Sequence, residues 1–368
     1  MNSLQIDRDI LLKPLQSVTG IVERRQTLPI LSNVLIEGKG GVLSLTATDL
    51  EIQVTATQAG ISADTEFAIT VSAKKLLDIL RALPEQTQLA LEQKDSKLLV
   101  RAGKSRFSLQ TLPAADFPRL PEGQPGTAEI RLPQSALKKL LSLTQYAMAQ
   151  QDIRYYLNGM LFVVNEKSLT LVATDGHRLA LASRELLESY IRNEIILPRK
   201  AVLELSRTLA DNDDQVLITL MPNQVRFDLE GITLVTKVID GKFPDYGRVV
   251  PSNYSKMLEV ERSILQDSLQ RAAILSNEKF RGVRWIVTPN SLRILCTNTE
   301  QEEAEEEIEV SYGADAIDIG FNITYLLEVL SSVDGQSMQC SFGDANTSML
   351  MTLPGRDDFK YVVMPMRI

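Results

Sequence analysis

The chain has 368 residues, of which 44% are hydrophobic and 23% are charged, as in a soluble globular protein with more than one core. No apolar run approaches the ~20 residues of a membrane span, so we expect neither a membrane helix nor a signal peptide. The net charge of −8, taken alone, argues against a nucleic-acid partner, because phosphate binding needs a basic surface.

The chain contains two cysteines, Cys296 and Cys340, and one histidine, His177. These three residues supply no zinc-ligand set of the usual spacing, so we expect no metal and no cofactor. Two isolated thiols are typical of core positions in a reducing compartment, and we expect a cytoplasmic protein.

Six amphipathic stretches, with apolar residues at three- and four-residue intervals, predict helices. In chain order they begin at Arg8, Ser72, Pro133, Pro198, Arg262 and Asn322. Three other segments predict a strand, a turn rich in Gly, Asn or Pro, and a second strand that leads to Thr-Asp or Thr-Asn. These segments begin at Asn33, Gly159 and Gly282.

The same elements recur at a nearly constant step, which indicates an internal repeat. Thr48, Thr174 and Thr297 are separated by 126 and 123 residues. We therefore predict three copies of one module, each with two helices and about eight short strands. Short turns between neighbouring strands favour antiparallel sheets with the helices on one face, an α+β architecture. The expected domains are residues 1–122, 129–250 and 253–368.

The charge is unevenly distributed. The six predicted helices together carry +6, and the rest of the chain carries −14. Basic helices often merely present a solvated face, and this alternative stays open from charge alone. A basic surface that recurs along a repeat can nevertheless hold a polyanion while the acidic remainder repels it.

The only histidine lies in the string ATDGHRLA, beside Asp175. A catalytic interpretation makes His177 a base that Asp175 orients, as in a hydrolase or nuclease. However, the equivalent of this string in the first copy reads TDLE, without histidine, and no nucleophile motif accompanies it. A binding role is the better interpretation.

Several uncommon strings spread over all three copies carry a resemblance to a known family. They include LKPLQSVTG, SRFSLQTLPAADFP, QDIRYYLNGML, ATDGHRLA, AAILSNEKFRGVR and the terminal YVVMPMR. The chain closely resembles the bacterial β sliding clamps, the processivity subunits of the replicative DNA polymerase III holoenzyme.

The resemblance implies a clamp fold of three repeated domains. Two chains join head to tail in a ring, with antiparallel sheets outside and helices inside. Twelve helices packed at ~9 Å make a circle of roughly 34 Å through their axes, which leaves about 24 Å for a duplex. Phosphate contacts without base recognition favour sliding.

The resemblance also implies a pocket that receives short clamp-binding peptides, with apolar walls and an arginine rim of Arg154, Arg178 and Arg248. The pocket residues carried over are Arg154, Tyr156, Leu157, Thr174, Gly176, His177, Arg178, Leu179, Pro244, Arg248, Val249, Ser348, Val362, Met364, Pro365, Met366 and Arg367. Gly247 departs from the family pattern, which has a basic residue there, and leaves Arg248 alone at that rim.

Two further surfaces follow from the resemblance. Near DNA the family places Arg25, Lys74, Gln151, Tyr155 and Tyr156, although strand alternation would make one tyrosine a core residue. The charge count alone adds Lys138, Lys139, Arg199 and Lys200 as lining candidates. The dimer interface implied is Lys75, Lys104, Arg106, Phe107 and Leu109 of one chain against Ile274, Leu275, Glu302, Glu305 and Glu306 of the other.

We therefore interpret the chain as a DNA sliding clamp without catalytic activity. Its expected partners are duplex DNA of any sequence, a second copy of itself, an ATP-driven clamp loader, the replicative polymerase and other proteins with clamp-binding motifs, and no membrane. The chain has no phosphate-binding loop with which to use ATP itself. Two alternatives stay open at this point: a hydrolase that uses Asp175 and His177, and a repeat scaffold that binds peptides but never DNA.

Overall fold

The computed structural model of the protein describes residues 4–23, 28–60, 66–121, 123 and 125–368. The chain divides into two compact units. The first unit consists of Met1–Ala136 and Leu203–Val238, and the second of Leu137–Val202 and Ile239–Ile368. Each unit is described by itself.

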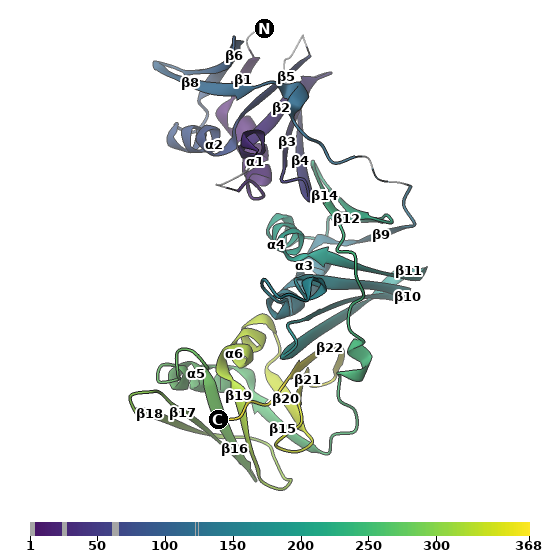
Figure 1. The fold of residues 1–368 in the computed structure, drawn as a ribbon, viewed down its shortest axis with the longest axis vertical. Coiled ribbons are helices and arrows are strands. Elements are labelled where there is room, and N and C mark those ends of the chain that lie inside the picture. Colours follow the sequence, from purple (N-terminus) through teal and green to yellow (C-terminus); the bar gives the residue numbers. More distant parts are fainter. Residues whose placement is uncertain (1–3, 24–27, 61–65, 122, 124) are drawn as a thin grey trace. The chain divides into compact units, whose positions relative to one another are not determined.

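All six predicted helices are confirmed (Figure 1). They are α1 (Arg8–Thr19), α2 (Ala73–Ala82), α3 (Gln134–Thr144), α4 (Arg199–Thr208), α5 (Arg262–Ala273) and α6 (Ile323–Ser332). Side chains at the helix starts satisfy free backbone N–H groups. Asp7 accepts from the Asp9 N–H at 2.8 Å, and Asn322 accepts from the Thr324 N–H at 2.9 Å.

The strands repeat in the same order in each copy. The first copy contains β1 (Leu4–Asp7), β2 (Asn33–Lys39), β3 (Val42–Thr48), β4 (Ile52–Ala59), β5 (Phe67–Ser72), β6 (Gln88–Lys94), β7 (Lys97–Ala102) and β8 (Ser105–Leu112). The second contains β9 (Ala128–Pro133), β10 (Gly159–Thr174), β11 (Arg178–Pro198), β12 (Gln215–Leu220), β13 (Gln224–Leu229) and β14 (Ile232–Lys237). The third contains β15 (Lys256–Glu261), β16 (Gly282–Thr288), β17 (Ser291–Thr297), β18 (Glu303–Glu309), β19 (Ile317–Asn322), β20 (Ser337–Phe342), β21 (Met349–Leu353) and β22 (Arg356–Val363).

The second copy has fewer strands because β10 and β11 each serve as two. Ser168 Oγ donates to the Asn165 carbonyl at 2.8 Å, and Glu166 has φ 48°, so the chain turns within β10. The part of β10 before this turn pairs with the end of β11, and the part after it pairs with the beginning of β11. The predicted turn in this copy is therefore present, and the three copies share one strand plan.

In the first unit a twelve-stranded sheet joins two copies, because β4 pairs antiparallel with β14. Thr236 lies opposite Ile52 in this pair. The inner face of the sheet buries Val54, Phe227 and Leu234 completely. Helix α1 packs on β3 and β4, and α2 packs beside α1 on β2 and β5. The helices of the first copy thus cover one face of its sheet, as predicted.

The second unit repeats this arrangement. Strand β11 pairs antiparallel with β22, and Val363 lies opposite Arg178. This pair joins two copies within a six-stranded sheet. A separate four-stranded sheet, in the order β18-β17-β16-β19, packs against α5 and α6. Its core contains Trp285, fully buried edge-on to Phe321 at 5.5 Å between ring centroids.

Two strands at corresponding junction positions each have an open edge within the described part of the chain. Strand β18 pairs only with β17, and the Ser105–Gln110 part of β8 pairs only with β7. Open edges offer unpaired N–H and C=O groups to another strand. These two edges lie in different units, one at each end of the repeat order.

Both cysteines are buried, as expected, and burial raises the pKa of the Cys296 thiol to about 11 and that of the Cys340 thiol to about 12. None of the helices in the described ranges is long and apolar enough to cross a membrane.

Candidate binding surfaces

The segment around His177 forms a tight turn after β10. Thr174 Oγ1 donates to the Arg178 carbonyl at 2.6 Å, and the His177 N–H donates to Asp175 Oδ1 at 2.9 Å. Among the described residues no hydrogen bond joins the His177 ring to the Asp175 carboxylate. The Thr-Asp pair therefore builds the turn and does not orient a catalytic imidazole.

The first copy makes the same turn without a histidine. Thr48 Oγ1 donates to the Ile52 carbonyl at 2.9 Å, and the Ile52 N–H donates to Asp49 Oδ1 at 2.8 Å. This shared geometry explains why Thr-Asp or Thr-Asn recurs in the sequence, because a short side-chain acceptor closes such a turn. The catalytic alternative loses its main support.

An apolar cluster lies beside this turn, where β11 meets β22. Leu157, Leu179 and Val362 are buried in the cluster together with Phe243. Leu179 lies opposite Val362, and the Met364 N–H donates to the His177 carbonyl at 2.9 Å. The structure thus brings the predicted pocket strings ATDGHRL and YVVMPM together, although they are far apart in the sequence.

Two exposed side chains are neighbours in sequence of residues at this cluster, since Val249 precedes Val250 and Met364 follows β22. Val249 is 46% exposed and Met364 is 50% exposed. Tyr156, Tyr246 and Leu350 pack partly buried against the cluster. Of the other predicted pocket residues, Pro244 and Arg367 are exposed, whereas Ser348, Pro365 and Met366 are half-buried. Exposed aliphatic side chains over a packed apolar floor can receive the hydrophobic anchors of a peptide.

Two of the three predicted rim arginines lie at the surface. Arg154 pairs with Asp152 at 2.8 Å and donates to the Asp175 carbonyl at 3.2 Å. Side-chain and backbone hydrogen bonds from Arg154 lower the pKa of Asp152 to about 2. Gly176, with φ 91°, lies under this guanidinium, and a Cβ there would come within 2.9 Å of it. Arg248 projects into solvent, with its side chain 88% exposed.

The prediction that Arg178 lies at the rim is wrong, because this residue lies beneath the rim and is only 7% exposed. Its guanidinium donates to Asp175 at 3.2 Å, to the Tyr146 carbonyl at 2.7 Å and to Glu328. It also stacks 4.2 Å from the centroid of the Tyr325 ring. Arg178 therefore fastens β11 to α6, which belongs to the next copy.

Sequence reasoning missed Tyr325 and Glu328. Both lie on α6, three residues apart, and so share one helix face. The helical spacing could have predicted that they share a face, but nothing in the sequence indicated that this face contacts Arg178.

The predicted DNA-facing residues are only partly brought together. Lys74 is exposed on α2 in the first unit, whereas the other described candidates lie in the second unit. Lys139 pairs with Asp334 at 2.8 Å, and Arg199 donates to the Met148 carbonyl at 3.1 Å. Burial lowers the pKa of Arg199. Lys138 and Lys200 are half-buried, and Gln151 is exposed. Arg25 lies outside the described residues.

The strand-alternation argument does not apply to the two tyrosines, because they do not lie in a strand. Tyr155 and Tyr156 lie in the 3-10 helix η4 (Tyr155–Leu157), where their rings meet edge-on at 5.8 Å. Tyr155 is 58% exposed, and Tyr156 packs against the apolar cluster. Successive side chains in a 3-10 helix point about 120° apart, so one tyrosine is exposed while the other is half-buried.

Most of the predicted interface residues lie at the two open strand edges. Lys104 precedes β8, and Arg106, Phe107 and the buried Leu109 lie on this strand, whereas Lys75 lies on α2. Ile274, 78% exposed, follows α5 and is accompanied by half-buried Leu275. Glu302 precedes β18, and within the chain Glu305 pairs with Arg293 and Glu306 with Arg271, both at 2.5 Å.

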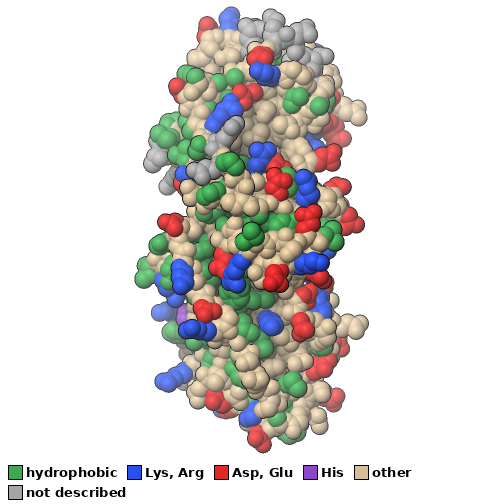
Figure 2. Space-filling view, turned by 90° about the vertical axis from the view of Figure 1, so that its right-hand side faces the viewer, with side chains coloured by type: hydrophobic (Ala, Val, Ile, Leu, Met, Phe, Trp, Pro, Cys, Tyr) green, Lys and Arg blue, Asp and Glu red, His purple; other side chains and the backbone are tan. Residues whose placement is uncertain are grey.

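Surface charge is mixed over the face drawn in Figure 2. Lys and Arg side chains are interspersed with Asp and Glu, and the single histidine reaches the surface beside basic side chains. In the described ranges no group of three or more His, Cys, Asp or Glu side chains could hold a metal ion. Fold and surfaces define a repeat protein that binds partners along strand edges and over an apolar cluster.

Comparison with known proteins specifies this class. The family model "DNA polymerase III beta subunit" matches in its N-terminal, central and C-terminal domains over residues 2–121, 131–245 and 247–367. The beta sliding clamps of Pseudomonas putida and Escherichia coli strain K12 are 48% and 45% identical, over 99% of each chain. The crystal structure of the DNA polymerase III subunit beta from Pseudomonas aeruginosa superposes with a TM-score of 0.96, at 46% identity over 100% of both chains. The chain belongs to the DNA polymerase III beta subunit family.

Proposed function

We propose that this protein is a DNA sliding clamp, a homodimeric ring that encircles duplex DNA of any sequence and tethers the replicative polymerase to it. Residues 1–122, 129–250 and 253–368 form its three domains. The clamp performs no catalysis, and an ATP-driven loader opens it. We place it in the cytoplasm, where bacterial DNA is replicated.

One observation carries this proposal. The chain forms the same strand junction, between the fourth strand of one copy and the last strand of the next, twice. The strands for a third such junction are present but unpaired with each other. The fourth strand of the first copy pairs with the last strand of the second, and the second copy pairs with the third in the same way. The remaining fourth strand is β18 and the remaining last strand is β8, and each of them has an open edge. A second copy of the chain supplies the missing partner for each edge, so two chains close head to tail.

We take the register of this contact from the first junction, because β8, like β14, continues directly from a short hairpin. In the first junction Ile232, the first residue of β14, lies opposite Ala56. Ala56 is three residues beyond Gln53, which lies opposite Thr48 in the preceding hairpin. In the first junction, therefore, the first residue of the last strand meets the residue three positions beyond the partner of the repeated threonine. In the second junction the equivalent residue, Ala182, meets Phe359, the fourth residue of the longer β22.

Applied to the open edges, the register of the first junction pairs opposite charges. Thr297 lies opposite Glu303, so this register selects Glu306 on β18 and Ser105 on β8. The resulting opposed pairs are Ser105 with Glu306, Arg106 with Glu305, and Lys104 with Glu307. Exposed ion pairs contribute only ~0–1 kcal/mol each, so the charges set orientation while Phe107, Ile274 and their neighbours supply apolar contact.

The peptide-bearing partners bind at the apolar cluster between β11 and β22. The exposed Val249 and Met364 receive aliphatic anchors, and the Arg154 and Arg248 guanidinium groups receive an acidic or amide group. The DNA contacts are weak, because closure of the ring retains the duplex without tight phosphate binding.

The test is loading onto a nicked circular plasmid with loader and ATP, followed by linearisation. A closed ring stays on the circle and slides off the linear ends. The matched control is Ile274→Ala with Leu275→Ala, which monomerises the protein and abolishes retention on the circle. Retention on linear DNA, or a tight dimer of the double variant in sedimentation, would contradict the proposal.

A further inference from the structure

The two junctions within the chain are equivalent strand by strand. Strands β4, β14, β13, β12 and β9 of the first unit correspond to β11, β22, β21, β20 and β15 of the second. The register fixes one row of directly opposed residues in each junction. The row in the first unit is Gln53, Val235, Arg226, Thr219 and Glu129. The equivalent row in the second unit is Leu179, Val362, Leu350, Ser341 and Met257.

The chemistry of the two rows differs although their geometry is the same. The second-unit row passes through the apolar cluster, where Leu179 and Val362 are buried and Leu350 packs against them. In the first unit Gln53 replaces a leucine, Arg226 replaces a second leucine, and Glu129 replaces a methionine. The position that binds apolar anchors in one junction is therefore polar in the other.

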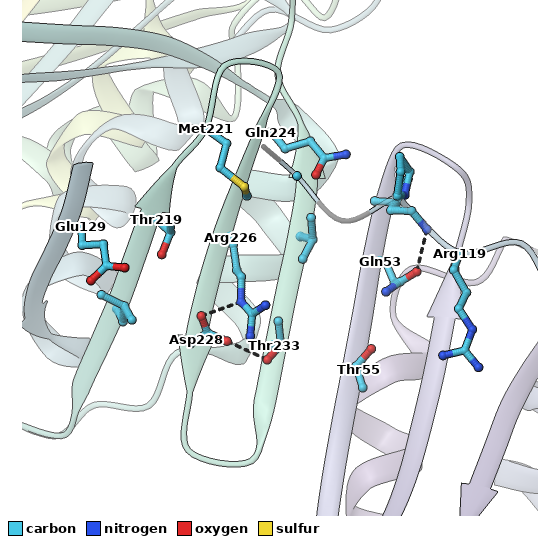
Figure 3. A pocket seen from close by; sticks show the side chains of 15 residues that line it. Gln53, Thr55, Arg119, Glu129, Thr219, Met221, Gln224, Arg226, Asp228 and Thr233 are labelled. Carbon is cyan, nitrogen blue, oxygen red and sulfur yellow. Dashed lines mark hydrogen bonds and ion pairs between the residues drawn. The ribbon is translucent and has the colours of Figure 1, made fainter. Parts of the chain in front are cut away.

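The polar row forms the floor of a groove of about 710 Å³ (Figure 3). Connector residues Arg119, Leu120 and Pro121 make one wall of the groove, and the Leu120 N–H donates to Gln53 Oε1 at 2.9 Å. Arg226 donates to Asp228 at 2.7 Å, and the same carboxylate accepts from the Thr233 hydroxyl at 2.8 Å. In Figure 3 Glu129 and Thr219 lie at the opposite end of the row from Gln53.

Hydrogen-bond acceptors remain in this groove after its internal pairs are made. Arg119 pairs with Glu37 at 2.6 Å, and Arg226 pairs with Asp228, so both arginines have carboxylate partners. Glu129 makes no ion pair with any described residue. Gln224, which lines the groove and is 7% exposed, has a buried Oε1 without a hydrogen-bond partner. A ligand that complements these groups carries donors and a positive charge.

We propose that this groove is a second peptide-binding site, which takes an extended segment of roughly five residues bearing an arginine or lysine side chain. The length follows from the row, because five strands at ~4.8 Å spacing span about 19 Å. The basic side chain pairs with Glu129, and the hydroxyl and amide groups of the floor bind the peptide backbone. The inference rests on the proposed function in that it treats the apolar cluster of the second unit as the peptide site.

Methyl NMR on the dimeric protein labelled at methionine separates the two sites. Met221 lines the polar groove, whereas Met364 follows β22 beside the apolar cluster and its N–H donates to the His177 carbonyl. The probe is the blocked peptide acetyl-Ser-Thr-Arg-Thr-Ser-amide, with leucine in place of arginine as the matched control peptide. The arginine peptide shifts the Met221 methyl signal in a saturable way and leaves Met364 unchanged, and the leucine peptide does not shift Met221.

Variants test the chemistry without disturbing the fold, because the side chains changed are exposed. Glu129→Gln weakens the arginine peptide about fivefold, whereas Glu230→Gln, an exposed carboxylate outside the groove, leaves its affinity unchanged. Glu129→Met with Arg226→Leu restores the apolar row and transfers binding to the leucine peptide. The inference is overturned if millimolar arginine peptide does not shift Met221, or if both peptides shift it equally. Failure of the proposed function appears separately, as loss of Met364 shifts with a clamp-binding peptide.

Discussion

Replacing Arg178 by lysine tests whether this residue fastens two copies of the repeat together. Lysine keeps the positive charge but loses the planar fork, so one ammonium group cannot reach Asp175, Glu328 and the Tyr146 carbonyl together. The stacking on the Tyr325 ring is lost as well. We expect the junction between β11 and α6 to weaken although the net charge of the protein stays the same.

The magnitude follows from the exposure of each partner. A hydrogen bond to a charged group contributes about 1.5–3 kcal/mol, and the bond to the Tyr146 carbonyl is in this class because Arg178 is almost fully buried. Glu328 is 39% exposed, so water replaces its lost partner, and its contribution is reduced to about 0–1 kcal/mol. The expected fall in the free energy of unfolding of the third copy is about 2–4 kcal/mol.

Trp285 makes this measurable, because it is the only tryptophan and lies fully buried in the third copy. Its fluorescence during guanidinium unfolding reports that copy alone, which avoids assuming two-state behaviour for the whole chain. Arg284→Lys is the control, since Arg284 and Asp318 are each 50% exposed and their pair contributes less than about 1 kcal/mol. Equal midpoints for Arg178→Lys and Arg284→Lys would refute the reasoning.

Three further predictions rest on named contacts. The pKa of Asp152 is about 2 in the folded protein, against its usual 3.8. Its stabilising effect is therefore present above pH 3.8 and is lost as the pH falls through 2. Carboxyl NMR measures the titration midpoint, which Arg154→Gln raises. The Cys340 thiol, buried with its pKa raised to about 12, does not react with a thiol reagent until the protein unfolds, and rapid reaction of native protein contradicts its burial. Arg106→Glu weakens the dimer, and adding Glu305→Arg restores it in sedimentation; no restoration excludes the register proposed for the two open edges.

The sequence was sufficient for the helices and for the repeat, because each depends on local periodicity and on constant spacing. The Thr-Asp turn was also visible, since its hydrogen bonds span only four residues. The role of Arg178 was not predictable. Its partners lie 3, 32 and 150 residues away, and only the folded packing of β11 against residues 145–147 and α6 brings them to one guanidinium.

The contrast between the two junctions was hidden for the same reason. Gln53 and Leu179 occupy equivalent places after repeated threonines, but the sequence does not say which residues lie opposite them. Once the strands pair, Gln53 lies in a row with Arg226 and Glu129, and the corresponding row around Leu179 is apolar. In the sequence, Gln53 in place of a leucine is an isolated polar residue. In the structure, it is part of a polar groove.

Reuse of one junction explains how a single module can serve three purposes. The backbone pairing between the fourth strand of one copy and the last strand of the next fixes a row of side chains on the open face of the sheet. Since the pairing uses backbone groups, the side chains of that row are free to differ. In the functions that we propose, an apolar row binds hydrophobic anchors, a polar row accepts donors, and the acidic edge of β18 against the basic edge of β8 directs two copies to join head to tail. The side chains of the row can therefore determine what binds, while the backbone pairing holds the copies together.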